Sequence, residues 1–146
     1  MLFANLDLDM IGIGPYIPHP ATPLAGVAPA LGAKQAPATE AMALKAVALA
    51  RLAGPCANIP ATTALATINR TDDREAALRA GANVVMPNLT PARYRRLYEI
   101  YPEKARADEA SAQYDQHLKA RLHALGRTIG TGPGSRRRTP ARSRRA

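Results

Sequence analysis

Cysteine, tryptophan and long hydrophobic runs are scarce in this sequence. Its 146 residues include one cysteine, Cys56, and no tryptophan, and aromatic residues make up 4%. One cysteine excludes an internal disulfide and cannot hold an iron–sulfur cluster, which is bound by several thiolates. No run approaches the roughly 18 apolar residues of a membrane helix, and MLFANLDLDM at the N-terminus has acids where a signal peptide has basic residues. These absences favour a soluble, cytoplasmic protein without a membrane partner.

The net charge of +9 belongs mainly to the C-terminal end of the chain. Seven arginines lie at or after Arg127, and the rest of the chain carries +2 once those seven charges are subtracted. The end is also poor in hydrophobic residues, which predicts a folded part over residues 1–127 and a disordered Arg-rich tail over residues 128–146. Such a tail suggests nucleic-acid binding, but no aromatic residue accompanies it for base stacking, so we do not favour that function.

Strand and helix patterns alternate along the chain. Short apolar or β-branched runs predict strands at residues 10–17, 58–68 and 83–86. Thr39 is a candidate N-cap for a helix over residues 40–53, whose apolar positions we expect at Met42, Leu44, Val47, Leu49 and Leu52, with Gly54 ending it. Asp72 with Glu75 predicts the start of a helix over residues 74–80, and Thr90 with Pro91 the start of one over residues 92–101. A final helix is expected over residues 109–125.

Repeated strand–helix alternation is typical of an α/β fold with parallel strands and right-handed crossovers. Three such units cannot close a barrel, and an α/β barrel usually needs roughly 250 residues. Parallel strands left open at both edges are uncommon in whole proteins. We therefore expect the last three strand–helix units of a partial (β/α) TIM-like barrel, with the missing units on the N-terminal side.

Four separated motifs then point to one family. In order and spacing, MIGIGPYIPHPATPL, NIPATTALATI, GANVVMPNLTPARYRRLYEIYP and LGR resemble the C-terminal half of the iron-only (FeFe) hydrogenase maturases of the HydE type. The resemblance covers residues 6–127 and extends, more weakly, to biotin synthase and to other proteins with the biotin- and thiamin-synthesis-associated region. It implies the C-terminal part of a radical-SAM barrel.

The resemblance also sets the expected cofactors and partner. The N-terminal half of such enzymes carries a CxxxCxxC loop with a 4Fe–4S cluster that binds S-adenosylmethionine, and this sequence has no CxxxCxxC. Arg106, Tyr114 and His117 stand where some relatives carry the cysteines of a second cluster, so we expect none here. The chain is then the substrate-binding, barrel-closing part of a maturase that is inactive without a separate N-terminal half.

The resemblance implies site residues at the C-terminal ends of the strands, where TIM-like barrels place function. Substrate contacts are expected from Thr62, Thr63, Met86, Tyr98 and Tyr101, and apolar contacts with the adenine of S-adenosylmethionine from Tyr16 and Ile17. The residues alone also permit a plain structural interpretation, with threonines as strand formers, tyrosines as a core-facing stripe and Met86 as core packing. His19 has no second metal ligand at a suitable spacing, and Cys56 is interpreted as structural or incidental.

Other functions remain open at this point. The chain is alternatively a non-enzymatic remnant, an interaction module that pairs with a separate N-terminal half, or a fragment of a biotin synthase-like enzyme. The substrate cannot be named, because the residues that determine it would be shared with the missing half.

Overall fold

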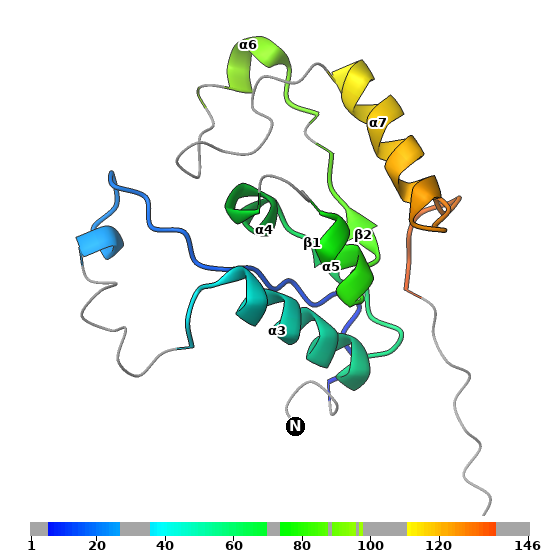
Figure 1. Cartoon of the computed structure of the whole chain (residues 1–146), viewed down its shortest axis with the longest axis horizontal. Helices are drawn as coiled ribbons and strands as arrows, with labels where there is room; N and C mark the ends of the chain where they lie inside the picture. The colour runs from blue at the N-terminus through cyan, green and yellow to red at the C-terminus, as the bar shows by residue number, and fades with distance from the viewer. Residues whose placement is uncertain are drawn as a thin grey trace, which may run out of the picture.

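The computed structural model describes residues 6–26, 36–69, 74–87, 89–95, 97 and 111–136 (Figure 1). The helices and strands follow in the order α3 (Glu40–Ala53), β1 (Pro60–Ala61), α4 (Thr63–Ile68), α5 (Glu75–Ala80), β2 (Val84–Val85), α6 (Ala92–Arg95) and α7 (Ser111–Ala124). Strands and helices alternate, so the predicted α/β class is confirmed. No helix within the described ranges is long and apolar enough to cross a membrane.

The strands are parallel and short. β1 pairs with β2 in the register Pro60↔Val84 and Ala61↔Val85. Residues 10–17, predicted as a strand, join this sheet through a single parallel bridge between Met10 and Asn58, closed by hydrogen bonds from Ile11 N to Asn58 O and from Asn58 N to Asp9 O, each 2.9 Å. The predicted parallel arrangement is therefore present, although regular pairing extends over fewer residues than the sequence suggested.

The predicted strand over residues 58–68 is wrong in its second half, which forms the helix α4. Thr62 is the N-cap of this helix, with φ −75° and ψ 150°, and its side chain accepts a hydrogen bond from Leu65 N. A threonine at this position satisfies one of the free N–H groups at the start of a helix. Alanine and leucine follow Thr63, and their helix propensity outweighs the β preference of the neighbouring threonines.

Helix α3 begins and ends where the sequence predicts. Thr39 caps it by accepting a hydrogen bond from Met42 N, and Gly54 follows its last residue. Its buried residues are Ala43, Val47 and Ala50. The prediction that Leu49 and Leu52 pack inward is wrong, because these side chains are 61% and 77% exposed.

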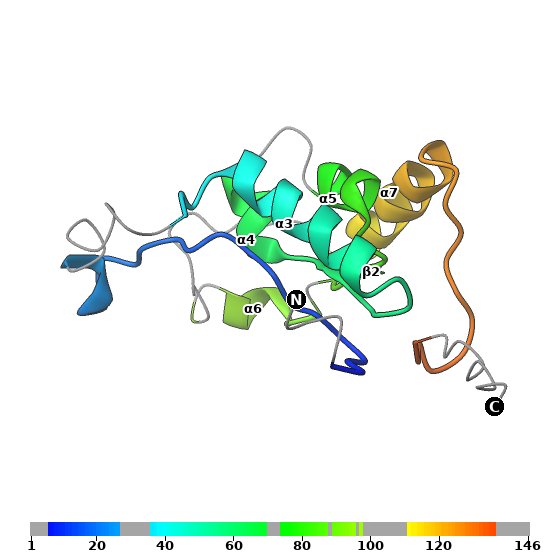
Figure 2. The same cartoon turned by 90° about the horizontal axis from the view of Figure 1, so that it is seen from below.

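The larger helices lie on one side of the sheet. Viewed from below, α3, α5 and α7 form one layer above the strands, whereas α6 lies on the other side (Figure 2). The core between strands and helices centres on Ile59, Val47, Leu65 and Leu78, all buried. Arg121 of α7 pairs with Glu75 of α5 at 2.5 Å, which fixes α7 beside α5.

The turns before β1 and β2 are held by Arg51 at the C-terminal end of α3. Its guanidinium donates to Gly81 O, Pro55 O and Ala57 O, each at 2.8 Å, and to Asn83 Oδ1 at 3.0 Å. Burial lowers the pKa of Arg51 from its ordinary value. Asn83 Oδ1 also accepts from Ile59 N at 2.8 Å. One side chain thus joins the N-terminal ends of both strands.

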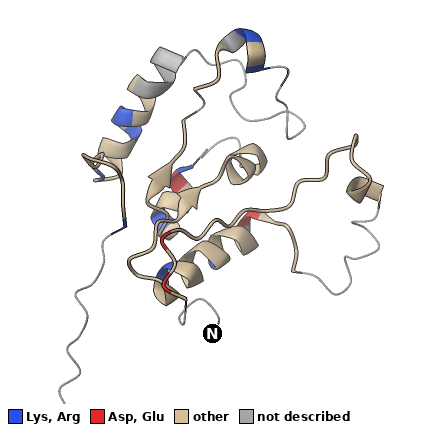
Figure 3. Cartoon of the chain, turned by 180° about the vertical axis from the view of Figure 1, so that it is seen from behind, with Lys and Arg blue, Asp and Glu red and all other residues tan. Residues whose placement is uncertain are grey.

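Residues that follow α7 cross the same end of the sheet. Asn58 Nδ2 donates to Gly134 O at 2.9 Å, and Arg136 lies 2.6 Å from Asp7 and 2.7 Å from Asp9. The hydrogen bond with Asp7 raises the pKa of Arg136. Figure 3 shows the basic and acidic residues in blue and red. Residues 128–136, part of the predicted tail, therefore make defined contacts, whereas residues 137–146 lie outside the described residues.

Candidate functional site

A row of residues crosses the C-terminal ends of the three parallel segments. The β1–β2 register, continued by one residue, places Thr62 beside Met86. The register of the Met10–Asn58 bridge, continued by four residues, places Gly14 beside Thr62. The glycine geometry agrees, because a Cβ added at Gly14 would lie 2.9 Å from Thr62 Oγ1. Gly14, Thr62 and Met86 therefore form one row at the sheet edge where α/β proteins commonly bind ligands.

Figure 2 shows that α3, α5 and α7 lie on one face of the sheet. Side chains alternate between the two faces of a strand. Ile13, Ala61 and Val85, one residue earlier in each segment, contact the core beneath the helices. The next residues, Gly14, Thr62 and Met86, consequently face the opposite side, where Met86 is 48% exposed.

The two threonines have different roles from those expected of neighbours in a strand. Thr62 Oγ1 accepts from Leu65 N at 3.4 Å, so its hydroxyl hydrogen stays available to donate to another group. Thr63 is the first residue of α4, and its carbonyl accepts from Thr67 Oγ1 at 2.9 Å. Both side chains are half-buried. Of the pair, only Thr62 belongs to the open row.

Tyr16 lies in a cavity of about 500 Å³ between residues 13–18 and the N-terminal half of α3. Its side chain is 42% exposed, and Ile17, half-buried, does not line this cavity. His19 caps a turn, with Nδ1 accepting from Ala21 N at 3.2 Å. Gly14 and Tyr16 both line this cavity, so the cavity adjoins the row of Gly14, Thr62 and Met86 at Gly14.

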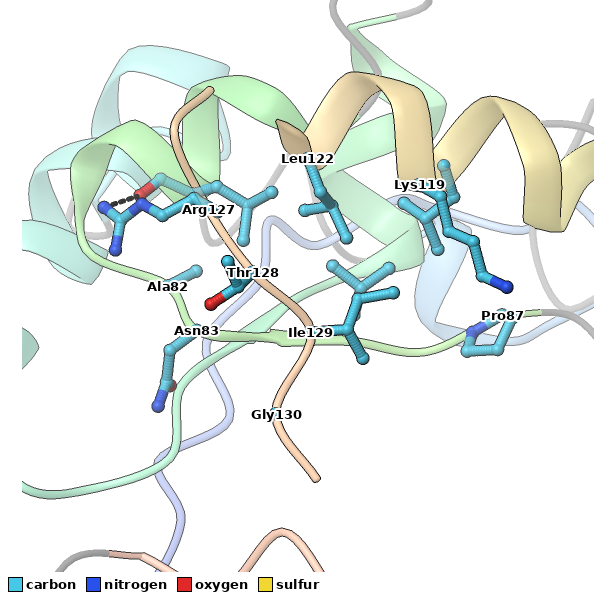
Figure 4. Close-up of a pocket in the computed structure, with 12 residues that line it drawn as sticks. Ala82, Asn83, Pro87, Lys119, Leu122, Arg127, Thr128, Ile129 and Gly130 are labelled. Atoms are coloured by element: carbon cyan, nitrogen blue, oxygen red, sulfur yellow. Dashed lines mark hydrogen bonds between the residues drawn. The ribbon is translucent and has the colours of Figure 1, made fainter. Parts of the chain in front are cut away.

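A second cavity, of about 450 Å³, lies between β2 and α7 (Figure 4). Val85 and Pro87 line it, together with Leu122 and Ile129, and Lys119 lies at its side. Arg127 borders it and donates to Leu78 O at 3.5 Å. Met86, between two lining residues, does not line this cavity, in agreement with its place on the other face of the sheet.

Several predicted site residues cannot be placed. Tyr98 and Tyr101 lie outside the described residues, so their substrate contacts stay predictions. Cys56 is half-buried in the turn after α3. Among the described residues, no group of three or more His, Cys, Asp or Glu side chains could hold a metal ion.

Two features were missed by the sequence interpretation. Gly14 was not singled out, although alternating glycines at Gly12 and Gly14 indicate a close approach within a strand. The hydrogen bonds by which Arg51 and Asn83 join the starts of β1 and β2, here called the Arg51 clamp, were also missed. Its signal is the repeated Ala-Asn pair before each strand, at residues 57–58 and 82–83.

The parallel strands, with the larger helices on one face, define an α/β unit with an open row of residues at its C-terminal edge. Compared with known proteins, the chain is 46% identical over 132 residues to the [FeFe] hydrogenase maturase subunit HydE of Thermotoga maritima. This match covers 90% of the chain and 35% of that protein, an extent consistent with a C-terminal part. The predicted resemblance to HydE is therefore confirmed. No protein-family model matches the chain.

Proposed function

We propose that the chain is the substrate-binding, barrel-closing C-terminal part of a radical-SAM maturase, with a role in assembling the active-site cluster of FeFe hydrogenase. The observation that carries this proposal is the 46% identity to HydE over nearly the whole chain. Because the chain spans 35% of HydE, the complete activity would need the remaining part. Its α/β units would form the last part of the (β/α) barrel.

The open row supports a substrate-facing role. Gly14 has no side chain, and its backbone therefore approaches Thr62 closely without covering the Thr62 hydroxyl. That hydroxyl can donate to a polar group of the substrate while its oxygen still caps α4. Met86, next in the row, offers a flexible apolar contact. Thr63, Tyr98 and Tyr101 would complete the substrate contacts, and Tyr16 with Ile17 would contact the adenine.

The iron–sulfur cluster does not fit this chain. A 4Fe–4S cluster is held by several thiolates, and the sequence offers Cys56 alone. We therefore assign the cluster and S-adenosylmethionine binding at the cluster to the N-terminal part, and derive no step of the radical reaction from the residues of this chain. Their role is to bind and orient the substrate.

Substitutions in a reassembled enzyme test this role. The chain would be co-expressed with an N-terminal HydE part that carries its cluster, and product formation compared with S-adenosylmethionine cleavage without substrate. Thr62→Val removes the hydroxyl but keeps the shape, and we expect product formation to fall while cleavage persists. Thr62→Ser retains both cap and donor and is the matched control. Equal product formation by Thr62→Val and the parent would contradict a substrate contact.

The tyrosines allow a parallel test. Tyr98→Phe and Tyr101→Phe each remove one hydroxyl, and we expect lower product formation with retained cleavage of S-adenosylmethionine. Positioning errors of about 1 Å can cost roughly a hundredfold in rate. Unchanged turnover and unchanged substrate affinity in both variants would identify the pair as packing residues.

A non-enzymatic pairing module is the second candidate function. The observation that favours it is an open strand edge at residues 10–18. Within the described residues, the backbone hydrogen bonds that join this segment to another strand reach only Asn58. This candidate predicts binding to an N-terminal part without any effect of the Thr62 and tyrosine substitutions on product formation.

A further inference from the structure

The cavity between β2 and α7 lies apart from the proposed substrate row. Val85, which contacts the core beneath the helices, lines this cavity, whereas Gly14, Thr62 and Met86 do not. The cavity is bordered by α5 and the turn after it, by β2, by α7 and by residues 127–130 (Figure 4). Its volume of about 450 Å³ falls within the range typical of small-molecule sites. It is therefore a candidate binding site distinct from the row.

The middle of the cavity is apolar. Leu78 of α5, Val85 of β2 and Leu122 of α7 line it, and Leu78 belongs to the buried core. Ile129, which also lines it, is 57% exposed. A ligand with an apolar body would remove part of this surface from water, which is the main favourable contribution to binding an apolar group. The cavity thus suits a ligand that is largely hydrocarbon.

The charge at the cavity is positive. Lys119 and Arg127 line it, and no acidic side chain does so in the described part of the chain. Figure 4 shows the two basic residues on opposite sides of Leu122 and Ile129. Burial lowers the pKa of Arg51, and the positive charge of Arg127 lowers it further. Arg127 therefore lies close enough to another guanidinium to repel it, and an anion at this cavity would reduce the repulsion.

A carboxylate matches this cavity better than a phosphate. Phosphate sites commonly use the free N–H groups at a helix N-terminus. Here α5 and α7 line the cavity with residues of their C-terminal halves, Leu78, Leu118 and Leu122. Arg127 already donates to Leu78 O at 3.5 Å, which leaves the ammonium of Lys119 as the main contact for an anionic group. A single ammonium matches the single charge of a carboxylate.

We propose that this cavity binds a small carboxylate with an apolar body, whose charged group pairs with Lys119 and whose body lies between Leu122 and Ile129. Such a ligand would contact both α7 and the sheet, and would stabilise the folded chain by mass action. The proposal does not rest on the proposed function, because the cavity lies on the helix side of the sheet and the substrate row faces the opposite side.

A titration followed by nuclear magnetic resonance tests the site. The full chain would be titrated with hexanoate, hexan-1-ol and hexylamine, which share one apolar body and differ in charge. We expect saturable amide shifts at Val85, Leu122 and Ile129. Hexanoate should bind about fivefold tighter than hexan-1-ol, since an exposed ion pair contributes roughly that factor at most, and hexylamine should bind most weakly.

Three substitutions separate the charged contact from the apolar one. Lys119→Met keeps the apolar stem and removes the charge, so the affinity for hexanoate should fall about fivefold, to that for hexan-1-ol. Lys45→Met is the matched control, because Lys45 is exposed on α3 and does not line the cavity. Ile129→Ser should weaken hexanoate and hexan-1-ol alike, by about threefold or more.

A preference for hexanoate that is lost in Lys119→Met and kept in Lys45→Met supports the proposal. Equal affinity of the parent for all three ligands overturns the carboxylate assignment. Shifts that do not saturate, or that saturate only at residues away from the cavity, overturn the site. Thermal unfolding gives a second measurement, because hexanoate should raise the melting temperature of the parent more than that of Lys119→Met. No rise in the parent, at concentrations that saturate the shifts, contradicts binding to the folded chain.

Discussion

Arg51→Ala should destabilise the folded part more than any other arginine substitution on an exposed helix face. Two of its hydrogen bonds are short and partly buried, to Gly81 O and Ala57 O at 2.8 Å each. Losing a partly buried bond to a charged donor costs about 1–1.5 kcal/mol after resolvation of the acceptor. The bonds to Pro55 O and Asn83 are exposed, and water replaces them at little cost. The expected loss is therefore about 2–3 kcal/mol.

Thermal unfolding followed by circular dichroism measures this loss. In a domain of this size, 1 kcal/mol corresponds to roughly 2–4 °C, so Arg51→Ala should melt about 4–12 °C below the parent. Arg79→Ala is the control, because that side chain is 66% exposed and pairs with Glu75 at 3.6 Å. It should shift the free energy of unfolding by less than about 0.5 kcal/mol. Indistinguishable melting of the two variants would refute the assignment of Arg51 as the clamp between the strand ends.

Three further predictions follow from individual contacts. Gly14→Ala should lower the free energy of unfolding in urea by about 1–2 kcal/mol, because its Cβ would lie 2.9 Å from Thr62 Oγ1. Thr62→Ala removes that oxygen, so the double variant should lose less stability than the sum of the losses in the two single variants. Additive losses would contradict this contact. Gly81→Ala should lower the free energy of unfolding by about 2 kcal/mol or more, since φ is +121° and the new Cβ meets Arg51. A free energy of unfolding within about 1 kcal/mol of the parent would be inconsistent with this geometry. Arg136→Gln should speed amide exchange in residues 128–136, and unchanged exchange would show that the ion pairs do not hold them.

The fold was predictable where local signals agree. The Thr39 cap and Gly54 fix both ends of α3, because a polar cap and a helix-ending glycine act within one turn. The inward face of α3 was not predictable, since alanine and leucine are both apolar and tertiary packing decides which face is covered. The prediction of a strand over residues 62–68 was wrong for a related reason. A threonine is compatible with a strand and with a helix N-cap, and periodicity over so few residues does not distinguish them.

The site was predictable in part. Strand order places Thr62 and Met86 at one sheet edge, and the register puts them side by side. The contribution of Gly14 depends on a close approach between segments that are 48 residues apart, which no local pattern specifies. The bond of Arg51 to Gly81 O is also long-range, because 30 residues separate the two. Roles for Thr63, Tyr98 and Tyr101 stay predictions.

The most direct test of the central claim is restoration of hydrogenase maturation. The chain and the portion of Thermotoga maritima HydE outside the alignment would be expressed, together and separately, in a host that makes an FeFe hydrogenase but lacks its own HydE. Hydrogen evolution by the lysate reports the assembled cluster. The account predicts activity when both parts are present and none with either alone. It would be contradicted if intact HydE restored activity and both parts together, each present as folded protein, gave no more than the separate parts.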